Sequence, residues 1–257
     1  MVTYLLKKSY QRKDLKNTDF KDLWNSHGVF TTMWIFSNPH KILFFSKHIN
    51  NLIKSLKDYN LYKPNIEKNI IKIIKLNLKK NVKYNHLLRI AINKKFISIS
   101  LRKRIKPKKN FKLKLLAYKR SKPEYKNLKY KKIIKYLSKI DTSISDIGLC
   151  VDKKILESAT SNILFIKKNK IYSPVNKFYR GITLKFLEKK VKRIIKKNIL
   201  INTLHTFDEI ILVGSGKGVV SINNIHNLNW SRKSSKIYGH LLRIYKKAVT
   251  NCPRYYG

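Results

Sequence analysis

The chain has 257 residues, 43% of them hydrophobic, so it can bury the core of one large domain or of two modest ones. This composition argues against global disorder, and no apolar run approaches the length of a membrane span. The formal net charge is +46, which raises the question of a polyanionic partner.

Lysine accounts for most of this charge, because 49 of the 59 basic residues are lysines and 10 are arginines. They are spread over almost the whole chain, whereas nucleic-acid recognition favours a basic patch with prominent arginine. Lysine, asparagine and isoleucine have A/T-rich codons, so a biased genome explains the composition without a ligand. We therefore predict no specific nucleic-acid partner, only weak, salt-sensitive adhesion to polyanions. A basic nucleic-acid-binding protein is the alternative.

Cysteine content and the N-terminal segment bear on the compartment. Cys150 and Cys252 form neither a disulfide framework nor a metal-ligand spacing, so we predict no metal site. Residues 1–17 lack the apolar block of a secretory signal. The expectation is a reducing, cytoplasmic location without membrane attachment.

Hydrophobic periodicity predicts the elements of the N-terminal half. Apolar residues recur at helical spacing over 45–59 and 66–78, with lysines on much of the other face. Over 96–101 apolar residues alternate with serines, which is typical of a half-buried strand. Residues 86–92 and 111–118 are further expected strands.

Pro123 interrupts this pattern, and we place a linker at 121–124. Beyond it the sequence predicts helices over 125–139, 181–197 and 231–248, and strands over 147–151, 162–167, 170–173, 199–205, 209–213 and 219–222. Helices and strands in both halves predict an α+β protein with two domains, 1–120 and 121–257.

Two glycine-containing segments could bind an anion. Residues 214–218, Gly-Ser-Gly-Lys-Gly, follow an apolar strand; the glycines let backbone N–H groups turn toward an anion, and Ser215 adds a hydroxyl. A plain tight turn is the alternative. Residues 181–183, Gly-Ile-Thr, begin an expected helix, whose N-terminus offers unpaired N–H donors and a positive dipole end. An ordinary helix cap is the alternative there.

Glu157 lies between two expected strands in a chain with only 13 acidic residues. A carboxylate in so basic a protein usually pairs with a surface lysine. If it is instead buried beside a pyridine nitrogen, it would keep that nitrogen protonated, and the ring could then accept electrons from a carbanion.

Six segments, in chain order from about residue 25 to 225, resemble motifs of the class IV (fold-type IV) aminotransferase family. Its members use pyridoxal 5′-phosphate and include branched-chain aminotransferases and 4-amino-4-deoxychorismate lyases. The resemblance implies a two-domain fold, with a small N-terminal α/β domain and a larger C-terminal pseudo-barrel domain. The similar segments are His27-Gly28-Val29-Phe30-Thr31-Thr32, Lys47 to Leu52, Tyr125 to Tyr130, Leu156 to Phe165, Arg180-Gly181-Ile182-Thr183, and Asp208-Glu209-Ile210 with Gly214-Ser215-Gly216.

The resemblance implies a role for each matching residue. Lys126 would form the internal aldimine with the cofactor and move the proton at the substrate Cα, for which its amine must be neutral. By residue type alone it is one of 49 lysines, and a solvated helix position is the alternative. Glu157 would pair with the pyridine nitrogen. The other assignments are Ile182, Thr183, Ser215 and Gly216 for the phosphate, Tyr130 for the phenolic oxygen, and Arg89 for a substrate carboxylate, with a surface arginine as its alternative.

One position departs from the family pattern. The family's phosphate-binding arginine falls here at Asn51, which carries no charge. Either a neighbouring lysine, Lys47 or Lys54, compensates, or the cofactor site has decayed. We expect His48 to be structural. The resemblance also implies a homodimer that acts on a small, amino-acid-like substrate.

Members of the family differ in the step after deprotonation of the substrate. The lyase eliminates pyruvate and leaves 4-aminobenzoate on the folate path, whereas a branched-chain or D-amino-acid transaminase transfers the amino group. The chain is short, and the segments Phe30-Thr31-Thr32 and Lys126-Asn127-Leu128-Lys129 resemble the lyase forms of their motifs. We therefore favour 4-amino-4-deoxychorismate lyase, with a transaminase as the alternative.

Overall fold

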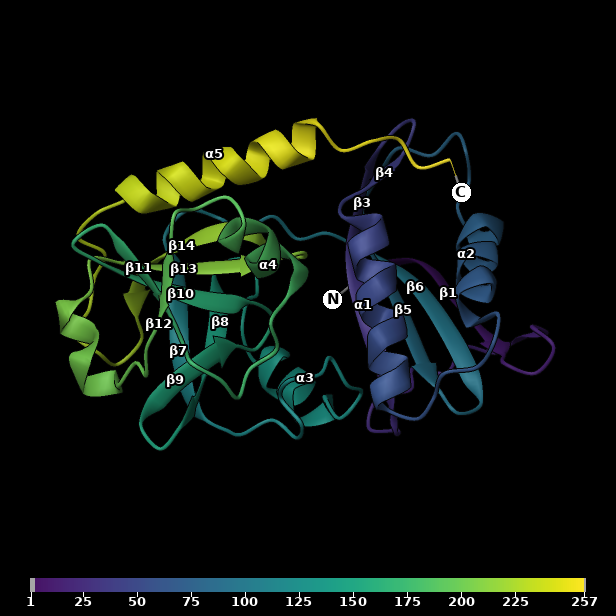
Figure 1. Ribbon diagram of the computed structural model, residues 1–257, viewed down its shortest axis with the longest axis horizontal. Coiled ribbons are helices and arrows are strands. Elements are labelled where there is room, and N and C mark those ends of the chain that lie inside the picture. Colours follow the sequence, from purple (N-terminus) through teal and green to yellow (C-terminus); the bar gives the residue numbers. More distant parts are fainter. Residues whose placement is uncertain (1–2, 257) are drawn as a thin grey trace. The chain divides into compact units, whose positions relative to one another are not determined.

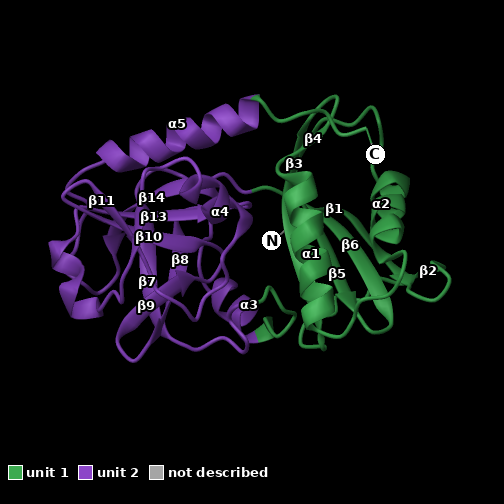
Figure 2. Cartoon of the chain, in the orientation of Figure 1, with its two compact units in different colours: residues 1–104, 125–131, 251–257 green, residues 105–124, 132–250 purple. Residues whose placement is uncertain are grey.

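The computed structural model describes residues 3–256, which form two compact units (Figure 2). Unit 1 contains the residues up to 104, residues 125–131 and those from 251 onward, and unit 2 contains 105–124 and 132–250. The sequence suggested a single boundary after residue 120. In the structure the chain crosses between the units more than once, because residues 111–117 pair with strands of unit 2 and the segment 126–128 bonds to a strand of unit 1.

Unit 1 is built on a six-stranded antiparallel sheet in the order β2-β1-β6-β5-β3-β4 (Figure 1). The strands are β1 (Tyr4–Gln11), β2 (Asn17–Thr18), β3 (Gly28–Ser37), β4 (Lys41–Ile42), β5 (Tyr84–Asn93) and β6 (Phe96–Lys103). Helices α1 (Phe45–Asp58) and α2 (Ile66–Asn77) cover one face of the sheet. The expected helices over 45–59 and 66–78 and the strands over 86–92 and 96–101 are confirmed.

The two faces of this sheet differ in chemistry, because side chains alternate along each strand. One face joins the helices in a core that includes Met33, Ile90 and Ile99 from the strands. The opposite face, called the polar face below, carries Thr32 of β3, Arg89 of β5, Ser98, Ser100 and Arg102 of β6, together with Phe30 and Ala91.

Unit 2 contains an eight-stranded mixed sheet in the order β12-β11-β10-β13-β14-β7-β8-β9 (Figure 1). The strands are β7 (Phe111–Ala117), β8 (Ser145–Val151), β9 (Lys154–Ser158), β10 (Asn162–Lys167), β11 (Lys170–Ser173), β12 (Ile194–Lys196), β13 (Glu209–Gly214) and β14 (Gly218–Ile225). The helices are α3 (Lys131–Leu137), α4 (Ile182–Glu188), the 3-10 helix η1 (Ile201–Thr206) and α5 (Lys236–Thr250). This mixed helix and sheet architecture confirms the predicted α+β class.

The expected helix over 125–139 is wrong in its first part, because α3 starts only at Lys131. The segment before it is extended along β3 instead. Phe30 N–H donates to Lys126 O over 2.9 Å, and Leu128 N–H donates to Gly28 O over 2.9 Å. Pairing with a strand therefore overrides the helical pattern of this segment.

Two further expectations are wrong between residues 181 and 205. The helix expected over 181–197 ends at Glu188, and residues 194–196 form β12, which pairs in parallel with β11. The strand expected over 199–205 is replaced by η1.

The C-terminal helix expected from 231 begins at Lys236, because Lys233 N–H first donates to Asp208 O over 2.9 Å. Tertiary pairing, which periodicity does not encode, decides these boundaries.

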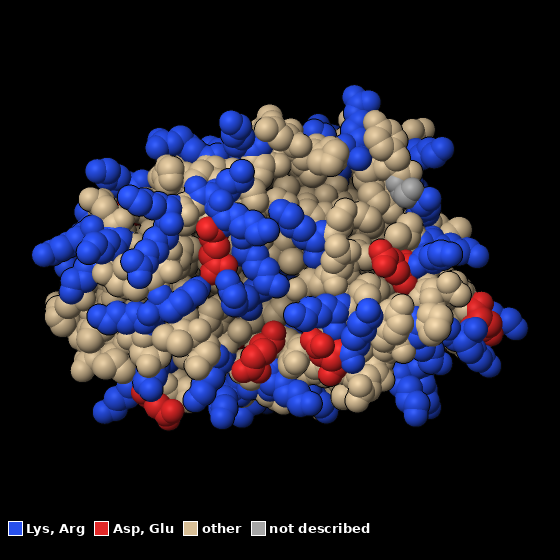
Figure 3. Space-filling model, in the orientation of Figure 1, with Lys and Arg blue, Asp and Glu red and all other residues tan. Residues whose placement is uncertain are grey.

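Lysines and arginines are distributed over the face shown in Figure 3 rather than gathered in one patch. Among the described residues, no helix is both long and apolar enough to cross a bilayer.

Candidate active site

Lys126 lies in unit 1 on the extended segment beside β3, where it is partly buried. Its Nζ is 5.2 Å from the centre of the Phe30 ring. Leu128 anchors the segment: it is fully buried in a cluster with Phe30 and Ala91, and a Cβ on Gly28 would come within 2.6 Å of its Cδ1. The backbone that carries Lys126 is therefore fixed on both sides by hydrogen bonds and packing.

Behind this segment, the Thr31 hydroxyl and His48 Nδ1 form a buried hydrogen bond of 2.8 Å that joins β3 to α1. Burial lowers the pKa of His48 to about 3, and the charge of Lys126 contributes in the same direction. His48 is therefore neutral at physiological pH and connects two elements of unit 1, a structural role.

Phe30, the ring beside Lys126, belongs to a cluster of three aromatic rings in unit 1. Trp24 meets Phe30 edge-on with 5.0 Å between centroids and stacks on Tyr130 at 5.8 Å. The guanidinium of Arg89 lies 4.2 Å from the Trp24 ring centre and pairs with Asp22 over 2.6 Å. Tyr130 and Arg89, both predicted to be site residues, thus belong to one group with Lys126.

Glu157 lies in unit 2 on β9, a strand that the sequence did not predict, and is 6% exposed. Arg120 Nε donates to its Oε1 over 2.7 Å, while Tyr179 N–H donates to its Oε2 over 3.4 Å. Burial raises the pKa of Glu157, and Arg120 opposes that shift through its charge and hydrogen bond. The alternative of a surface carboxylate paired with a lysine is wrong: the partner is a buried arginine.

Arg120 is a site residue that was not predicted from the sequence. Its side chain is 6% exposed, and it also donates from Nη2 to Pro123 O over 2.5 Å. A signal was available, because arginine is rare in this lysine-rich chain and suits a buried carboxylate pair better than lysine does.

The two glycine-containing segments of unit 2 approach each other at the start of β10. Gly181 N–H donates to Asn162 Oδ1 over 2.9 Å, and Asn162 Nδ2 donates to Tyr179 O over 2.5 Å. A Cβ on Gly214 would lie 2.8 Å from Ser161 Oγ. The predicted phosphate-binding segments, 181–183 and 214–216, are therefore held against two adjacent residues, and Tyr179 links them to Glu157.

The donors in this part of unit 2 fit a phosphorylated pyridine. Thr183 is 1% exposed, and its Oγ1 finds no hydrogen-bond partner among the described residues. An unsatisfied buried hydroxyl is costly, so it implies a missing acceptor. Ile182, the neighbouring predicted phosphate residue, is 5% exposed, while Ser215 and Gly216 are partly exposed. Glu157 is buried in the same unit and is the carboxylate predicted to pair with the ring nitrogen.

The residue at the family's arginine position, Asn51, lies on α1 in unit 1 and is partly buried. Of the two lysines that could compensate, Lys47 places its Nζ 5.2 Å from the Phe44 ring centre, and Lys54 is exposed. Neither observation identifies one of these two lysines as the residue that takes over the role of the missing arginine.

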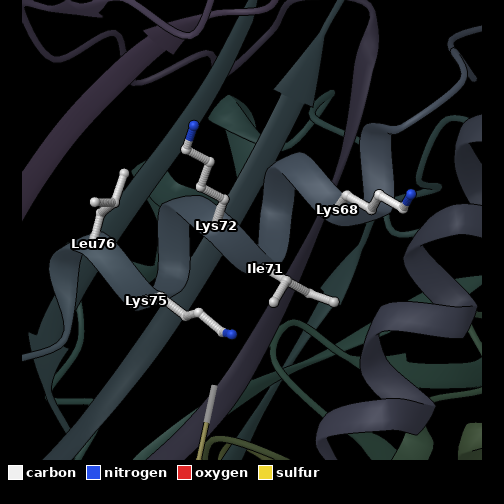
Figure 4. Close-up of a pocket in the computed structure, with 5 residues that line it drawn as sticks. All are labelled: Lys68, Ile71, Lys72, Lys75 and Leu76. Atoms are coloured by element: carbon white, nitrogen blue, oxygen red, sulfur yellow. The ribbon is translucent and has the colours of Figure 1, made fainter.

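A hollow of about 430 Å³ beside α2 is lined by Lys68, Ile71, Lys72, Lys75 and Leu76 (Figure 4). The three lysine side chains point in different directions. Because no acid, hydroxyl or imidazole lines this hollow, we do not regard it as a catalytic site.

The fold and the site define a pyridoxal-phosphate enzyme of fold-type IV. Residues 28–225 match the sequence profile of the family described as amino-transferase class IV. This match spans most of the chain, which therefore belongs to the class IV aminotransferase family of pyridoxal-phosphate-dependent enzymes.

Solved structures with a similar fold include both reaction types of the family. Branched-chain aminotransferase from Thermoproteus uzoniensis has a TM-score of 0.77 at 16% identity over 93% of each chain. A protein from Legionella pneumophila assigned as a 4-amino-4-deoxychorismate lyase has a TM-score of 0.70 at 16% identity, over 86% of this chain and 91% of its own. An aminotransferase from Brucella abortus bound to pyridoxal phosphate has a TM-score of 0.72 at 15% identity, over 94% and 98%. These identities show the fold alone. No curated protein matches the sequence.

Proposed function

We propose that this enzyme is a 4-amino-4-deoxychorismate lyase. The observation that carries the proposal is the environment of Leu128, two residues after Lys126. The lyase motif has leucine at this position, whereas the transaminase motif has glycine. Leu128 is 0% exposed and packs with Phe30 and Ala91, so the lyase residue is integrated into the packing of the segment that carries the lysine. A glycine here would leave a cavity.

The proposed reaction needs a base and an acceptor for an electron pair. A proton leaves the ring carbon that bears the amino group, the bond between the ring and the ether oxygen breaks, and the departing enolate takes up one proton at its methylene carbon to become pyruvate. The remaining ring is 4-aminobenzoate, so the atoms balance. When bound, the cofactor supplies a protonated pyridine ring that accepts the electron pair.

The chain's own residues supply the other functions. Lys126 would attach the cofactor and move the proton. Glu157 would accept the N–H of the pyridine ring, for which its Oε2 is suited because its contact within the described residues is a long bond from Tyr179. Thr183, Ile182, Ser215 and Gly216 would hold the phosphate through hydroxyl or backbone N–H groups, and Tyr130 would hold the phenolic oxygen.

A paired assay tests the proposal. We expect purified enzyme with pyridoxal phosphate to release pyruvate and 4-aminobenzoate from aminodeoxychorismate, with little transfer from leucine to 2-oxoglutarate. The opposite ratio would favour the transaminase. Borohydride reduction and peptide mapping should place the phosphopyridoxyl group on Lys126. The K126A variant should lose both label and activity, and K129A is the matched control because Lys129 is exposed on the same segment.

We further propose that the enzyme acts as a homodimer in the cytoplasm. Both cysteines are free and buried, which is consistent with a reducing compartment. Light scattering at several protein concentrations would test the dimer, and a monomer with full activity would contradict it.

A further inference from the structure

Two arginines lie on neighbouring strands of the polar face of unit 1. Arg89 is directly opposite Ser100, and Arg102 is directly opposite Leu87, so the two arginines are diagonal neighbours on β5 and β6. Diagonal neighbours of this kind have Cα atoms roughly 7–8 Å apart, within reach of long side chains. This places the two arginines on the same face of the sheet, on neighbouring strands.

The surroundings of the two arginines do not balance their charge. Arg89 pairs with Asp22, but among the described residues Arg102 has no carboxylate within ion-pair distance. Burial lowers the pKa of Arg102; Tyr4 opposes this shift, whereas the charge of Arg89 adds to it. Of these two partly buried cations, Arg89 therefore has a carboxylate partner, and Arg102 has none among the described residues.

That carboxylate is replaceable. The Asp22 side chain is 57% exposed whereas that of Arg89 is 12% exposed. An ion pair with one solvated partner is weak, so a ligand carboxylate can take its place on the guanidinium. The ion pair also shows that the guanidinium of Arg89 can be reached by a carboxylate in this position.

The arginine pair is connected to Lys126 through contacts within unit 1. Lys126 Nζ lies over the Phe30 ring, and the Phe30 ring packs edge-on against Trp24. The Arg89 guanidinium stacks on the Trp24 ring. Phe30 and Arg89 are also on the same face of the sheet. A flat ring lying on these aromatic side chains would have an amine end toward Lys126 and an acidic end toward the arginines.

We propose that the polar face of unit 1 is a binding site for a substrate with two carboxylates, one held by Arg89 and the other by Arg102. The proposal rests on the proposed function and specifies its substrate class: a ring that carries two acidic groups. Arginine binds carboxylates through paired N–H groups, and the hydroxyls of Thr32 and Ser100 lie beside the pair. A branched aliphatic substrate would leave the charge of Arg102 uncompensated.

The test uses two aromatic probes that differ by one carboxylate, benzoate and isophthalate (benzene-1,3-dicarboxylate). Their dissociation constants are measured by calorimetry on the full-length holoenzyme. We expect isophthalate to bind about tenfold more tightly than benzoate, since one further charged hydrogen-bonded contact is of that size. In R102Q this preference should disappear while benzoate affinity is retained, which also shows that the variant is folded. R89Q should weaken both probes.

The matched control is K103Q, which removes one positive charge from the next residue of β6. Lys103 is exposed and points to the other side of the strand, so both probes should bind it as they bind the wild type. Equal affinity of the two probes for the wild type would overturn the proposal, as would the same loss in K103Q as in R102Q. Displacement of isophthalate by equimolar inorganic phosphate would also contradict it, because the arginines would then act as a general anion site. If the preference for isophthalate holds but no pyruvate is released, the binding site stands and the lyase proposal fails.

Discussion

Arg120 and Glu157 form a buried ion pair, with 2.7 Å between Nε and Oε1 and side-chain exposures of 6% and 8%. The pair fixes one carboxylate oxygen, and Arg120 opposes the rise in the pKa of Glu157 that burial causes. Arg120 therefore fixes the orientation of the Glu157 carboxylate.

We predict that R120Q lowers the free energy of unfolding by about 3–5 kcal/mol, because it leaves Glu157 buried without its cationic partner. Urea unfolding at neutral pH measures this change. Adding E157Q to R120Q should recover part of the loss, since the unpaired charge is then gone. The control is R180Q, because the Arg180 side chain is 55% exposed in its pair with Glu188 and should contribute less than about 1 kcal/mol. Equal losses for R120Q and R180Q would contradict the prediction.

His48 should make stability depend on pH. Its pKa is lowered from 6.5 to about 3 in the folded protein, so the unfolded chain binds the proton more readily. The contribution of neutral His48 to the free energy of unfolding is complete above about pH 6.5 and is lost progressively as the pH falls toward about 3. Between pH 7 and pH 5 the loss should be about 2 kcal/mol. In H48Q, unfolding should show a pH dependence that is smaller by this amount; an unchanged dependence would refute the assignment.

Glu209 is predicted to hold the start of α5. Its carboxylate is 1% exposed and accepts hydrogen bonds from Ile237 N–H over 2.9 Å and Tyr238 N–H over 2.8 Å. E209A leaves these donors unsatisfied and should cost about 1–3 kcal/mol. Hydrogen exchange at residues 237 and 238 should accelerate. E67Q, an exposed acidic position in the first turn of α2, should change neither measurement.

The elements that the sequence predicted correctly are those whose own pattern decides them. In α1 the apolar stripe with Ile49 and Leu52 is buried as the period requires. In β6 the alternation of isoleucine and serine corresponds to the two faces of the sheet. The helix predicted around Lys126 is wrong because the backbone of this segment forms hydrogen bonds with Gly28 and Phe30, roughly a hundred residues earlier. Periodicity carries no information on such distant partners.

Motif order named the candidate residues Glu157 and Thr183, and both are buried in unit 2. The electrostatic surroundings of Glu157 did not follow from motif order. The rarity of arginine made Arg120 a candidate for a buried ion pair, but its partner did not follow from the sequence, because Glu157 is 37 residues away and only the fold brings the two together. Likewise, the pairing of Arg89 with Arg102 depends on the register of β5 and β6.

Thr183 gives a prediction in which stability and cofactor affinity change in different ways. Its Oγ1 is buried and lacks a partner among the described residues, so T183V removes an unsatisfied hydroxyl at nearly constant volume. The variant without cofactor should unfold at the same or a slightly higher urea concentration. Its dissociation constant for pyridoxal phosphate should rise about tenfold, because a hydrogen bond to a charged acceptor is lost.

The matched control for T183V is T203V, in which the hydroxyl that donates to Leu200 O over 2.8 Å is removed. It should lose stability by about 1 kcal/mol and keep its cofactor affinity. If T183V instead destabilises the protein without cofactor and leaves the affinity unchanged, Thr183 Oγ1 has a protein partner in solution and does not bind the phosphate. The two variants together therefore distinguish a hydroxyl that binds the cofactor from a hydroxyl that stabilises the fold.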